Sequence, residues 1–356
     1  MDNLYALIMA GGGGTRLWPR SRQGQPKQFL NIGTAHSLLR EAFLRIKPII
    51  PAERVLVITG QKWLEAVTAE LPEIPLDNIL GEPEGRGTAP AIGLAAEVIA
   101  RRDPSAVLAC LTADHLIRNQ ERFRDILLSA AGSAYAGRII LLGITPQEPN
   151  TGYGYIEADT GSVNGGMTLR VKSFKEKPTP EVAEQFLAAG NYYWNGGMFV
   201  WSVATIRDAM GRFIPDTAAR LSRIADAWGT RTQDYVLADA WPGIKNETID
   251  YAIIEKADDV CVIPADIGWS DVGSWAAVFD VLPSDSWDNV IEGEYVGVDS
   301  RNNLIYSPNK LVAVVGVEDM VIVDADDVLL ILPRSRAQDV KKIVDELRHQ
   351  KRTEYL

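Results

Sequence analysis

Over the first half of the chain, short runs of apolar residues alternate with longer stretches in which apolar residues recur every three to four positions. The short runs predict buried strands at Leu4–Met9, Arg54–Thr59, Ala106–Thr112 and Arg138–Ile144. The longer stretches predict helices, among them Thr88–Arg102 and Glu121–Ala134. Because strands and helices alternate, we expect an α/β domain with a mostly parallel sheet that helices cover on both faces.

The pattern changes twice further along the chain. From Gly152 to Lys175 it becomes strand-like with Gly-rich turns, which predicts a β excursion inside the α/β domain. Helical spacing returns at Thr179–Ala189 and Pro215–Ala227. After Trp287 come closely spaced short strands with Asn, Asp and Pro turns, predicted at Tyr295–Val298, Leu304–Tyr306, Leu311–Val317, Met320–Val323 and Val328–Leu332.

A helix over Ser335–Gln350 is predicted to close the chain, with one apolar stripe formed by Val340, Ile343, Val344 and Leu347. The change of pattern places a domain boundary near Ser284–Asn289. We therefore predict a catalytic domain at residues 1–286 and a small β domain with a closing helix at residues 287–356.

Composition and charge narrow the possible functions. The 356 residues include 36 Lys and Arg against 47 Asp and Glu, so the net charge is −11, and we expect no binding to nucleic acid or to anionic membranes. No run approaches the roughly 20 apolar residues of a membrane span, which predicts a cytoplasmic protein. Cys110 and Cys261 lie in apolar runs and are predicted to be buried thiols, too few for a zinc framework.

Four consecutive glycines, Gly11–Gly14, follow the first predicted strand directly. A plain strand–helix turn needs only one or two, whereas a longer glycine loop can lay backbone N–H groups along a phosphate chain. A Walker A loop would continue with Gly-Lys-Ser/Thr, but Thr15 and Arg16 follow here. A dinucleotide fingerprint would have its third glycine where Arg16 stands, so both common phosphate loops are excluded.

The stretch Gly11–Pro19, continued by Pro26-Lys27-Gln28-Phe29, resembles the signature of nucleoside-diphosphate-sugar pyrophosphorylases. Trp18 and the Pro26–Phe29 ending are most similar to the mannose-1-phosphate guanylyltransferase branch. The resemblance implies a nucleotidyltransferase fold, which is a Rossmann-like mixed sheet flanked by helices, and a small C-terminal domain like a left-handed β-helix. It also implies that the nucleotide is bound by Ala10, Gly11, Gly12, Gly13, Gly14, Thr15, Arg16 and Lys27.

A second motif, Glu82–Ala91, is predicted to end a strand and open a helix, with Thr88 as its N-cap and Pro90 in its first turn. In the resembling family this segment lines the nucleobase pocket, where backbone groups read guanine. The resemblance adds Pro83, Gly87, Thr88 and Asp114 to the nucleotide-binding residues. The family commonly has Asn where this chain has Gly87.

Two aspartates are candidate metal ligands. Asp114 follows a strongly apolar strand, where α/β enzymes place ligand-binding groups, and Asp271 lies in Trp269–Trp275. Each could instead be a helix or turn cap. The resemblance pairs Asp114 and Asp271 as the carboxylates that hold Mg²⁺, which prefers oxygen ligands.

Three further motifs resemble the family's sugar-side elements, namely Thr151–Glu157, Phe174–Pro178 and Trp194–Phe199. Each is weak alone, but their order and spacing agree with the family. The implied sugar-phosphate ligands are Gly152, Glu157, Glu176, Lys177, Asn195, Gly196 and Asp250. Together with the nucleotide side, the implied catalytic set is Arg16, Lys27, Asp114, Lys177 and Asp271.

The reaction implied is GTP plus mannose 1-phosphate giving GDP-mannose and pyrophosphate, with Mg²⁺ as cofactor and a homodimer as the assembly. Two alternatives remain at this point. One is the same chemistry with another pair, such as dTTP or UTP with glucose 1-phosphate. The other is a non-catalytic paralogue that binds a nucleotide sugar. The segment after Val290 is expected to serve assembly and support of the sugar site, since no ligand-type cluster lies in it.

Overall fold

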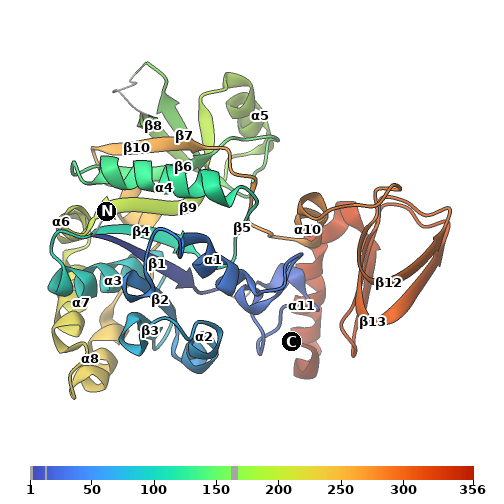
Figure 1. The fold of residues 1–356 in the computed structure, drawn as a ribbon, viewed down its shortest axis with the longest axis horizontal. Coiled ribbons are helices and arrows are strands. Elements are labelled where there is room, and N and C mark those ends of the chain that lie inside the picture. The colour runs from blue at the N-terminus through green and yellow to red at the C-terminus, as the bar shows by residue number, and fades with distance from the viewer. Residues whose placement is uncertain (1–2, 13, 162–166) are drawn as a thin grey trace. The chain divides into compact units, whose positions relative to one another are not determined.

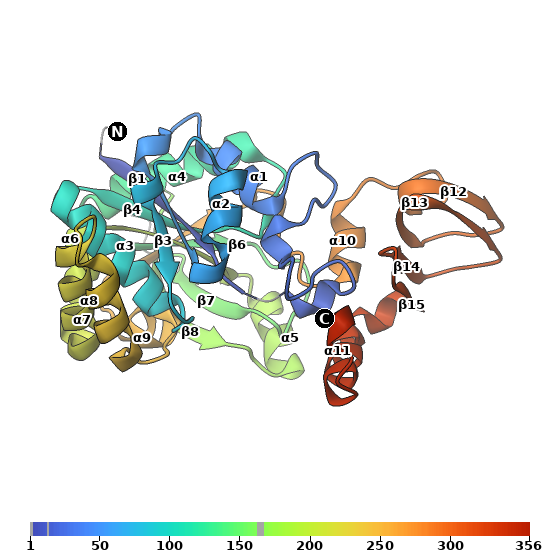
Figure 2. The same cartoon turned by 90° about the horizontal axis from the view of Figure 1, so that it is seen from below.

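A computed structural model describes residues 3–12, 14–161 and 167–356, and its ribbon is shown in Figures 1 and 2. The chain forms two compact units that do not follow its linear order. The first comprises Met1–Gly11, Ala42–Ala113 and Ile117–Trp269, and the second comprises Gly12–Glu41, Asp114–Leu116 and Ser270–Leu356. The glycine loop and Asp271 therefore lie at or next to positions where the chain passes from one unit to the other.

The first unit is built on a nine-stranded sheet in the order β3-β2-β1-β4-β9-β6-β10-β8-β7. Its strands are β1 Leu4–Ala10, β2 Val55–Gly60, β3 Ile79–Glu82, β4 Val107–Thr112, β6 Ile139–Ile144, β7 Gly154–Asp159, β8 Leu169–Glu176, β9 Tyr192–Ser202 and β10 Val260–Ala265. The pairings make β8 and β9 antiparallel to the other strands, which all run in one direction. This confirms a mixed, mostly parallel sheet, and β7 with β8 forms the predicted β excursion.

The direction of the strands decides which residues share an edge of the sheet. Ala10 and Glu82 end β1 and β3 at the carboxyl edge, where ligands bind in sheets of this kind. Because β9 runs the opposite way, its beginning lies at this same edge, with Asn195 opposite Gly143 near the end of β6. Residues that are far apart in the sequence thus meet at one edge.

Helices cover both faces of this sheet. On β1, Ala6, Leu7 and Ile8 are all fully buried although successive side chains point to opposite faces. The helices of this unit are α1 Leu38–Ile46, which begins in the second unit, α2 Leu64–Glu70, α3 Thr88–Arg102, α4 Gln120–Ala134, α5 Pro180–Ala189, α6 Val203–Phe213, α7 Pro215–Ala227, α8 Gln233–Ala240 and α9 Ile249–Ala252. The observed bounds of α3 and α7 are those predicted.

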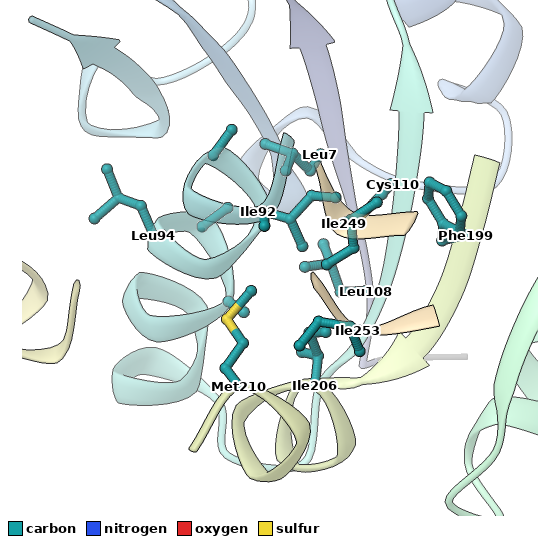
Figure 3. Packing of buried hydrophobic residues seen from close by; sticks show 14 of the residues in the cluster. Leu7, Ile92, Leu94, Leu108, Cys110, Phe199, Ile206, Met210, Ile249 and Ile253 are labelled. Atoms are coloured by element: carbon teal, nitrogen blue, oxygen red, sulfur yellow. The ribbon is translucent and has the colours of Figure 1, made fainter. Parts of the chain in front are cut away.

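The apolar core of the first unit is centred on α3 (Figure 3). Ile92 of α3 lies among Leu7 of β1, Leu108 of β4 and Met210 of α6, all buried. A Cβ atom at Gly93 would come within 2.7 Å of Met210, so the close packing of α3 on α6 requires this glycine. Cys110 and Cys261 are buried free thiols, as predicted. Within the described residues, no helix is long and apolar enough to cross a membrane.

The second unit contains a four-stranded sheet, two helices and the segment that follows the glycine loop. Its elements are α10 Trp275–Val281, β12 Val290–Val298, β13 Leu304–Val315, β14 Met320–Asp324, β15 Leu329–Pro333 and α11 Val340–His349. Successive strands β12, β13 and β14 pair in parallel, as the coils of a β-helix do, and β15 pairs antiparallel with β14. The short strands β5 (Leu116–Ile117) and β11 (Trp269–Ser270) lie where the chain passes between the units.

Three details of the predicted C-terminal segment were wrong. The two strands predicted at Leu304–Tyr306 and Leu311–Val317 are one strand, β13, because the chain continues extended through Pro308. The closing helix starts at Val340, preceded by a 3-10 segment that is kinked at Arg336. Ile343 remains 40% exposed, so the buried stripe consists of Val340 and Val344 with Leu347 at its margin.

Candidate functional site

The carboxylate of Asp114 and the ammonium of Lys27 meet in the second unit. Lys27 Nζ donates a hydrogen bond to Asp114 Oδ2 at 2.8 Å and another to the main-chain carbonyl of Asp271. The Lys27 side chain is only 8% exposed. Its position requires Gly14, which has a φ of +53° and whose Cβ, if present, would overlap the Lys27 side chain. Three of the predicted catalytic residues, Lys27, Asp114 and Asp271, are thus brought together.

This arrangement favours the ionised form of Asp114. Burial alone would raise the pKa of the carboxyl, but the nearby Lys27 and His115 outweigh it, so the pKa lies below its usual value. The His115 Nε2 atom lies 4.0 Å from Asp114 Oδ1. The cluster therefore offers a charged oxygen ligand beside a buried cation.

A strained turn holds Asp271 in place. Asp271 Oδ1 accepts a hydrogen bond of 3.1 Å from the backbone N–H of Gly273. Between them, Val272 has a φ of +45°, which is rare for a β-branched residue and costs about 1–3 kcal/mol. The Val272 side chain is fully buried in the apolar core of this unit, and that burial offsets the strain. Strained backbone concentrates at functional sites, which gives Asp271 support independent of its motif.

The remaining nucleotide-loop residues divide between the two units. Ala10, whose carbonyl accepts a hydrogen bond from Thr59 Oγ1, and Gly11 belong to the first unit. Gly12, Gly14 and Thr15 belong to the second, and Gly13 lies outside the described residues. Arg16 is exposed and donates a hydrogen bond of 3.3 Å to Gln338 Oε1, so its described partner lies 322 residues away in the C-terminal segment.

The two aspartates fit a metal that prefers oxygen ligands, although the described residues contain no group of three or more His, Cys, Asp or Glu placed to hold an ion. Asp114 is half-buried and ionised, and Lys27 connects its carboxylate to the main-chain carbonyl of Asp271, so the Asp271 carboxylate belongs to a residue next to it. Two carboxylates are a typical protein contribution to a Mg²⁺ site, because substrate phosphates and water complete its coordination.

In the first unit, the predicted nucleobase segment follows β3. Gly87, not Thr88, is the N-cap of α3, so the predicted cap was wrong. Gly87 has φ +83° and ψ 177°, a conformation open essentially to glycine alone, and a Cβ there would overlap the carbonyl of Glu247. The hydroxyl of Thr88 instead accepts a hydrogen bond of 2.9 Å from the N–H of Ile249, which ties α3 to α9.

Glu82 is the first residue of the motif Glu82–Ala91, and the sequence alone assigns its side chain no role. It ends β3 at the carboxyl edge of the sheet and is only 8% exposed. Its Oε1 atom is buried and has no hydrogen-bond partner among the residues that the structure describes, and burial raises the pKa of the carboxyl to about 7. A buried acceptor without a partner is costly, so it indicates a ligand that supplies a donor. The sequence signal that could have identified Glu82 was an acidic residue at the end of a predicted buried strand.

The sugar-side motifs bring together Asn195, Asp250 and Glu176 in the same unit. Asn195 Nδ2 donates a hydrogen bond of 2.7 Å to Asp250 Oδ1, and Asn195 Oδ1 accepts one from the N–H of Gly197. Burial raises the pKa of Asp250; the bond from Asn195 opposes this rise, and neighbouring Glu176 adds to it. Glu176 lies against Gly154, where a Cβ would overlap its carboxylate. These groups form an oriented set of donors and acceptors suited to hydroxyl groups.

Lys177 adjoins this set and has a strained backbone. Its φ is +44°, its side chain is 65% exposed, and its Nζ atom lies 3.4 Å from Glu176 Oε1. An exposed cation on a strained residue is available to an anionic ligand.

The two predicted sugar-side glycines have structural contacts. The N–H of Gly152 donates a hydrogen bond to Asn150 Oδ1, two residues earlier in the same loop. Gly196 is a packing residue, because a Cβ there would come within 3.2 Å of Leu142 O.

Glu157 lies further along β7, where its carboxylate accepts a hydrogen bond of 2.7 Å from the Ser173 hydroxyl and another from the Tyr192 hydroxyl. An aromatic cluster that sequence reasoning missed adjoins the sugar motifs. The ring of Tyr153 lies 5.0 Å from that of Trp194 and 5.3 Å from that of Trp269. The sequence contained a signal for this cluster, because Tyr153 and Trp194 lie within the sugar-side motifs, next to Gly152 and Asn195.

The comparisons with known proteins agree with this arrangement. A model of the nucleotidyl transferase family matches residues 5–286, and a model of the MannoseP isomerase/GMP-like beta-helix domain matches residues 293–347. The mannose-1-phosphate guanylyltransferase of Klebsiella pneumoniae is 39% identical over 357 residues, covering 99% of this chain and 75% of that protein. The xanthan biosynthesis protein XanB of Xanthomonas campestris pv. campestris is 37% identical over 360 residues, with the same coverage.

Among solved structures, that of a mannose-1-phosphate geranyltransferase from Thermus thermophilus matches with a TM-score of 0.88 at 33% identity, covering 97% of this chain and 99% of that one. The likeness thus extends over both the transferase and the β-helix parts. The chain belongs to the nucleotidyl transferase family, in the branch where mannose-1-phosphate guanylyltransferases carry a β-helix domain after the transferase domain.

Proposed function

We propose that this chain transfers GMP from GTP to mannose 1-phosphate and releases pyrophosphate. The observation that carries the proposal is the meeting of Lys27, Asp114 and Asp271 in a chain whose guanylyltransferase relatives align along nearly its whole length. An oxygen of the sugar phosphate attacks the α-phosphorus of GTP, and the bond from that phosphorus to the oxygen bridging it to the β-phosphate breaks. Since both reactants are anions, the protein acts by neutralising and aligning them.

Each residue has a distinct part in this proposal. Lys27 and Arg16 hold the triphosphate, and Lys177 holds the attacking phosphate while Asn195 and Asp250 orient the sugar. Glu157, Gly152 and the backbone of the tightly packed Gly196 complete the sugar side, and the segment with Pro83, Gly87 and Thr88 surrounds the base. A divalent cation, Mg²⁺ in our proposal, would be bound by Asp114 and Asp271 and would supply positive charge for the triphosphate.

The test is pyrophosphate release over a matrix of GTP, UTP, dTTP and ATP with mannose 1-phosphate and glucose 1-phosphate. We expect the highest kcat/KM with GTP and mannose 1-phosphate. A higher value with dTTP or UTP and glucose 1-phosphate would replace this pair with another. Release with none of the pairs would favour a non-catalytic paralogue.

Glu82 is proposed to select the base. Guanine presents two adjacent donors, N1–H and the N2 amino group, and the ionised carboxylate of Glu82 can accept both hydrogen bonds, which would lower the pKa that burial has raised. Uracil and thymine present one donor flanked by two carbonyl oxygens, which a carboxylate would repel. The partnerless oxygen of Glu82 at the start of the nucleobase segment supports this role.

We expect Glu82→Gln to lower kcat/KM for GTP by about 10- to 100-fold, the usual effect of losing a hydrogen bond to a charged group. The activity with dTTP or UTP should stay constant or rise. Glu84→Gln is the matched control, because Glu84 lies two residues further on and its side chain is 69% exposed. An equal loss with all nucleotides would show that Glu82 supports the fold and does not read the base.

We further propose a cytoplasmic homodimer, in line with the two free buried thiols. The assembly is supported by an apolar strip on β12 and β13. Val298 and Val315 are opposite one another in the strand register and are 54% and 73% exposed, and Val296 shares their face. Exposed valines in register form an apolar strip, and a second copy of this strip would cover it in a two-fold dimer.

Val298→Glu with Val315→Glu is expected to weaken dimerisation by at least about 100-fold, since two buried valines contribute about 1.5–3 kcal/mol each. Light scattering at micromolar protein should then report a monomer. Leu76→Glu is the control, because Leu76 is 70% exposed in the first unit. A double variant that remains dimeric would place the interface elsewhere.

A further inference from the structure

The segment that follows the glycine loop is held by the C-terminal part of the chain, inside the second unit. Arg16 Nη1 binds Gln338 Oε1 at 3.3 Å, and Trp18 Nε1 donates a hydrogen bond of 2.7 Å to the carbonyl of Tyr355. Arg22 forms two hydrogen bonds of 2.6 and 2.7 Å with the carboxylate of Asp327. Side chains at three positions of this short segment therefore find their partners more than 300 residues away.

Apolar packing adds to these polar contacts. Leu17, between Arg16 and Trp18, is 1% exposed in the cluster that contains Val340 and Val344 of α11. The Arg20 guanidinium lies 4.5 Å from the centroid of the Tyr306 ring on β13. The backbone on either side of Arg16 is thus held in place by contacts with the C-terminal segment.

The partners of Arg16 and Arg22 differ in one respect that matters for phosphate binding. Arg22 is paired with a carboxylate, so its charge is compensated where it lies. Arg16 is bound by an amide oxygen, which restrains the guanidinium without neutralising it. A long exposed side chain loses rotamer entropy when it binds a ligand, and an existing restraint reduces that loss. The neutral amide of Gln338 therefore orients the Arg16 guanidinium and leaves its positive charge uncompensated by this contact.

We propose that Gln338 is a positioning residue for Arg16, so that the C-terminal segment forms part of the nucleotide site. Arg16 contacts the triphosphate and Gln338 acts only through Arg16. This inference rests on the proposed function for the identity of the anion. It differs from the expectation that the tail serves assembly and sugar support alone.

The test replaces the amide with a side chain of similar length that has no oxygen. We expect Gln338→Met to raise KM for GTP by about 5-fold, and KM for pyrophosphate in the reverse reaction similarly, with KM for mannose 1-phosphate and Tm unchanged. Calorimetry with GTP alone should give the same loss of affinity without turnover. Gln350→Met is the matched control, because Gln350 is also in the tail but binds Glu346 on the same helix.

A double-mutant cycle separates positioning from general support. On an Arg16→Ala background, Gln338→Met should have no further effect on KM for GTP, since the group it orients is gone. Additive effects, or a loss shared by both substrates together with a lower Tm, would overturn the proposal. A fall in KM for GTP would also overturn it, because Gln338 would then hold Arg16 away from the phosphates. Absence of turnover and GTP binding in the unmodified protein would instead refute the proposed function.

Discussion

Replacing Asp271 by asparagine is expected to lower kcat by at least about 100-fold, as for the loss of one preorganised charged group at a reacting phosphate. The substitution keeps the size of the side chain and the oxygen that accepts the N–H of Gly273. The main-chain carbonyl that binds Lys27 is also retained. Because the turn and its buried Val272 stay in place, the change removes a charge and little else.

The measurements are kcat at saturating substrates across a Mg²⁺ titration, and Mn²⁺ binding by calorimetry with GTP present. We expect a weaker apparent affinity for both ions along with the loss of rate. Asp285→Asn is the matched control, because Asp285 accepts the N–H of Trp287 two residues on, in the same geometry as Asp271. An Asp271→Asn variant with normal rate and ion binding would remove this residue from the site.

The two strained residues show what sequence patterns can and cannot predict about this site. Motif resemblance placed Lys177 and Asp271 in the site, and the structure finds unusual positive φ angles at Lys177 and beside Asp271, at Val272. Resemblance could not supply those angles. They depend on tertiary contacts such as the burial of Val272 in a core made from distant segments.

Helix positions were predictable where the signal is local, and caps were not. The bounds of α3 and α7 follow from apolar spacing and the residues at their ends. The cap at Gly87 depends on the close approach of Glu247, about 160 residues away, so a local rule favoured Thr88 and failed. Periodicity likewise gave one apolar face to α11, but only tertiary packing decides that Val344 is buried and Ile343 is not.

The same limit explains why the sequence does not single out Gln338, to which we assign a positioning role. Nothing in the sequence around Gln338 differs from an ordinary exposed position, and its contact with Arg16 spans 322 residues. Glu82 was easier to identify from the sequence, since it is the first residue of the motif Glu82–Ala91. The role proposed for Glu82 rests on a buried oxygen that has no partner within the described part of the chain, which only the structure reveals.

Replacing Lys27 or Lys177 by methionine should impair the use of different substrates. Lys27→Met is expected to lower kcat/KM for GTP by about 100- to 1000-fold, because it removes a buried cation next to the reacting phosphates. KM for mannose 1-phosphate should change little. Lys177→Met should mainly raise KM for mannose 1-phosphate, by about 10- to 100-fold, while GTP binding measured alone persists.

The environments of the two lysines are the reason for this contrast. Lys27 is buried and already bonded to Asp114, so removing it also leaves that carboxylate without its nearest cation, and burial then raises the Asp114 pKa. Lys177 is exposed beside Glu176, so its loss removes a ligand contact and disturbs no buried pair. Lys175→Met is the control for Lys177, because Lys175 lies two residues earlier, within β8, and is also exposed.

Calorimetry with each substrate alone, followed by initial rates with both, distinguishes the two roles. Since Lys27→Met can also weaken the fold, the double variant Lys27→Met with Asp114→Asn provides the comparison, because it removes both charges and leaves none unpaired. Recovery of stability in the double variant would show that the unpaired Asp114 carboxylate destabilises Lys27→Met, and its turnover is not compared because Asp114 is itself a proposed metal ligand. If Lys27→Met instead impairs mannose 1-phosphate binding and Lys177→Met impairs GTP binding, the two cations serve the opposite substrates. In that case Asp114, which is bonded to Lys27, would lie on the sugar-phosphate side of the reacting phosphorus.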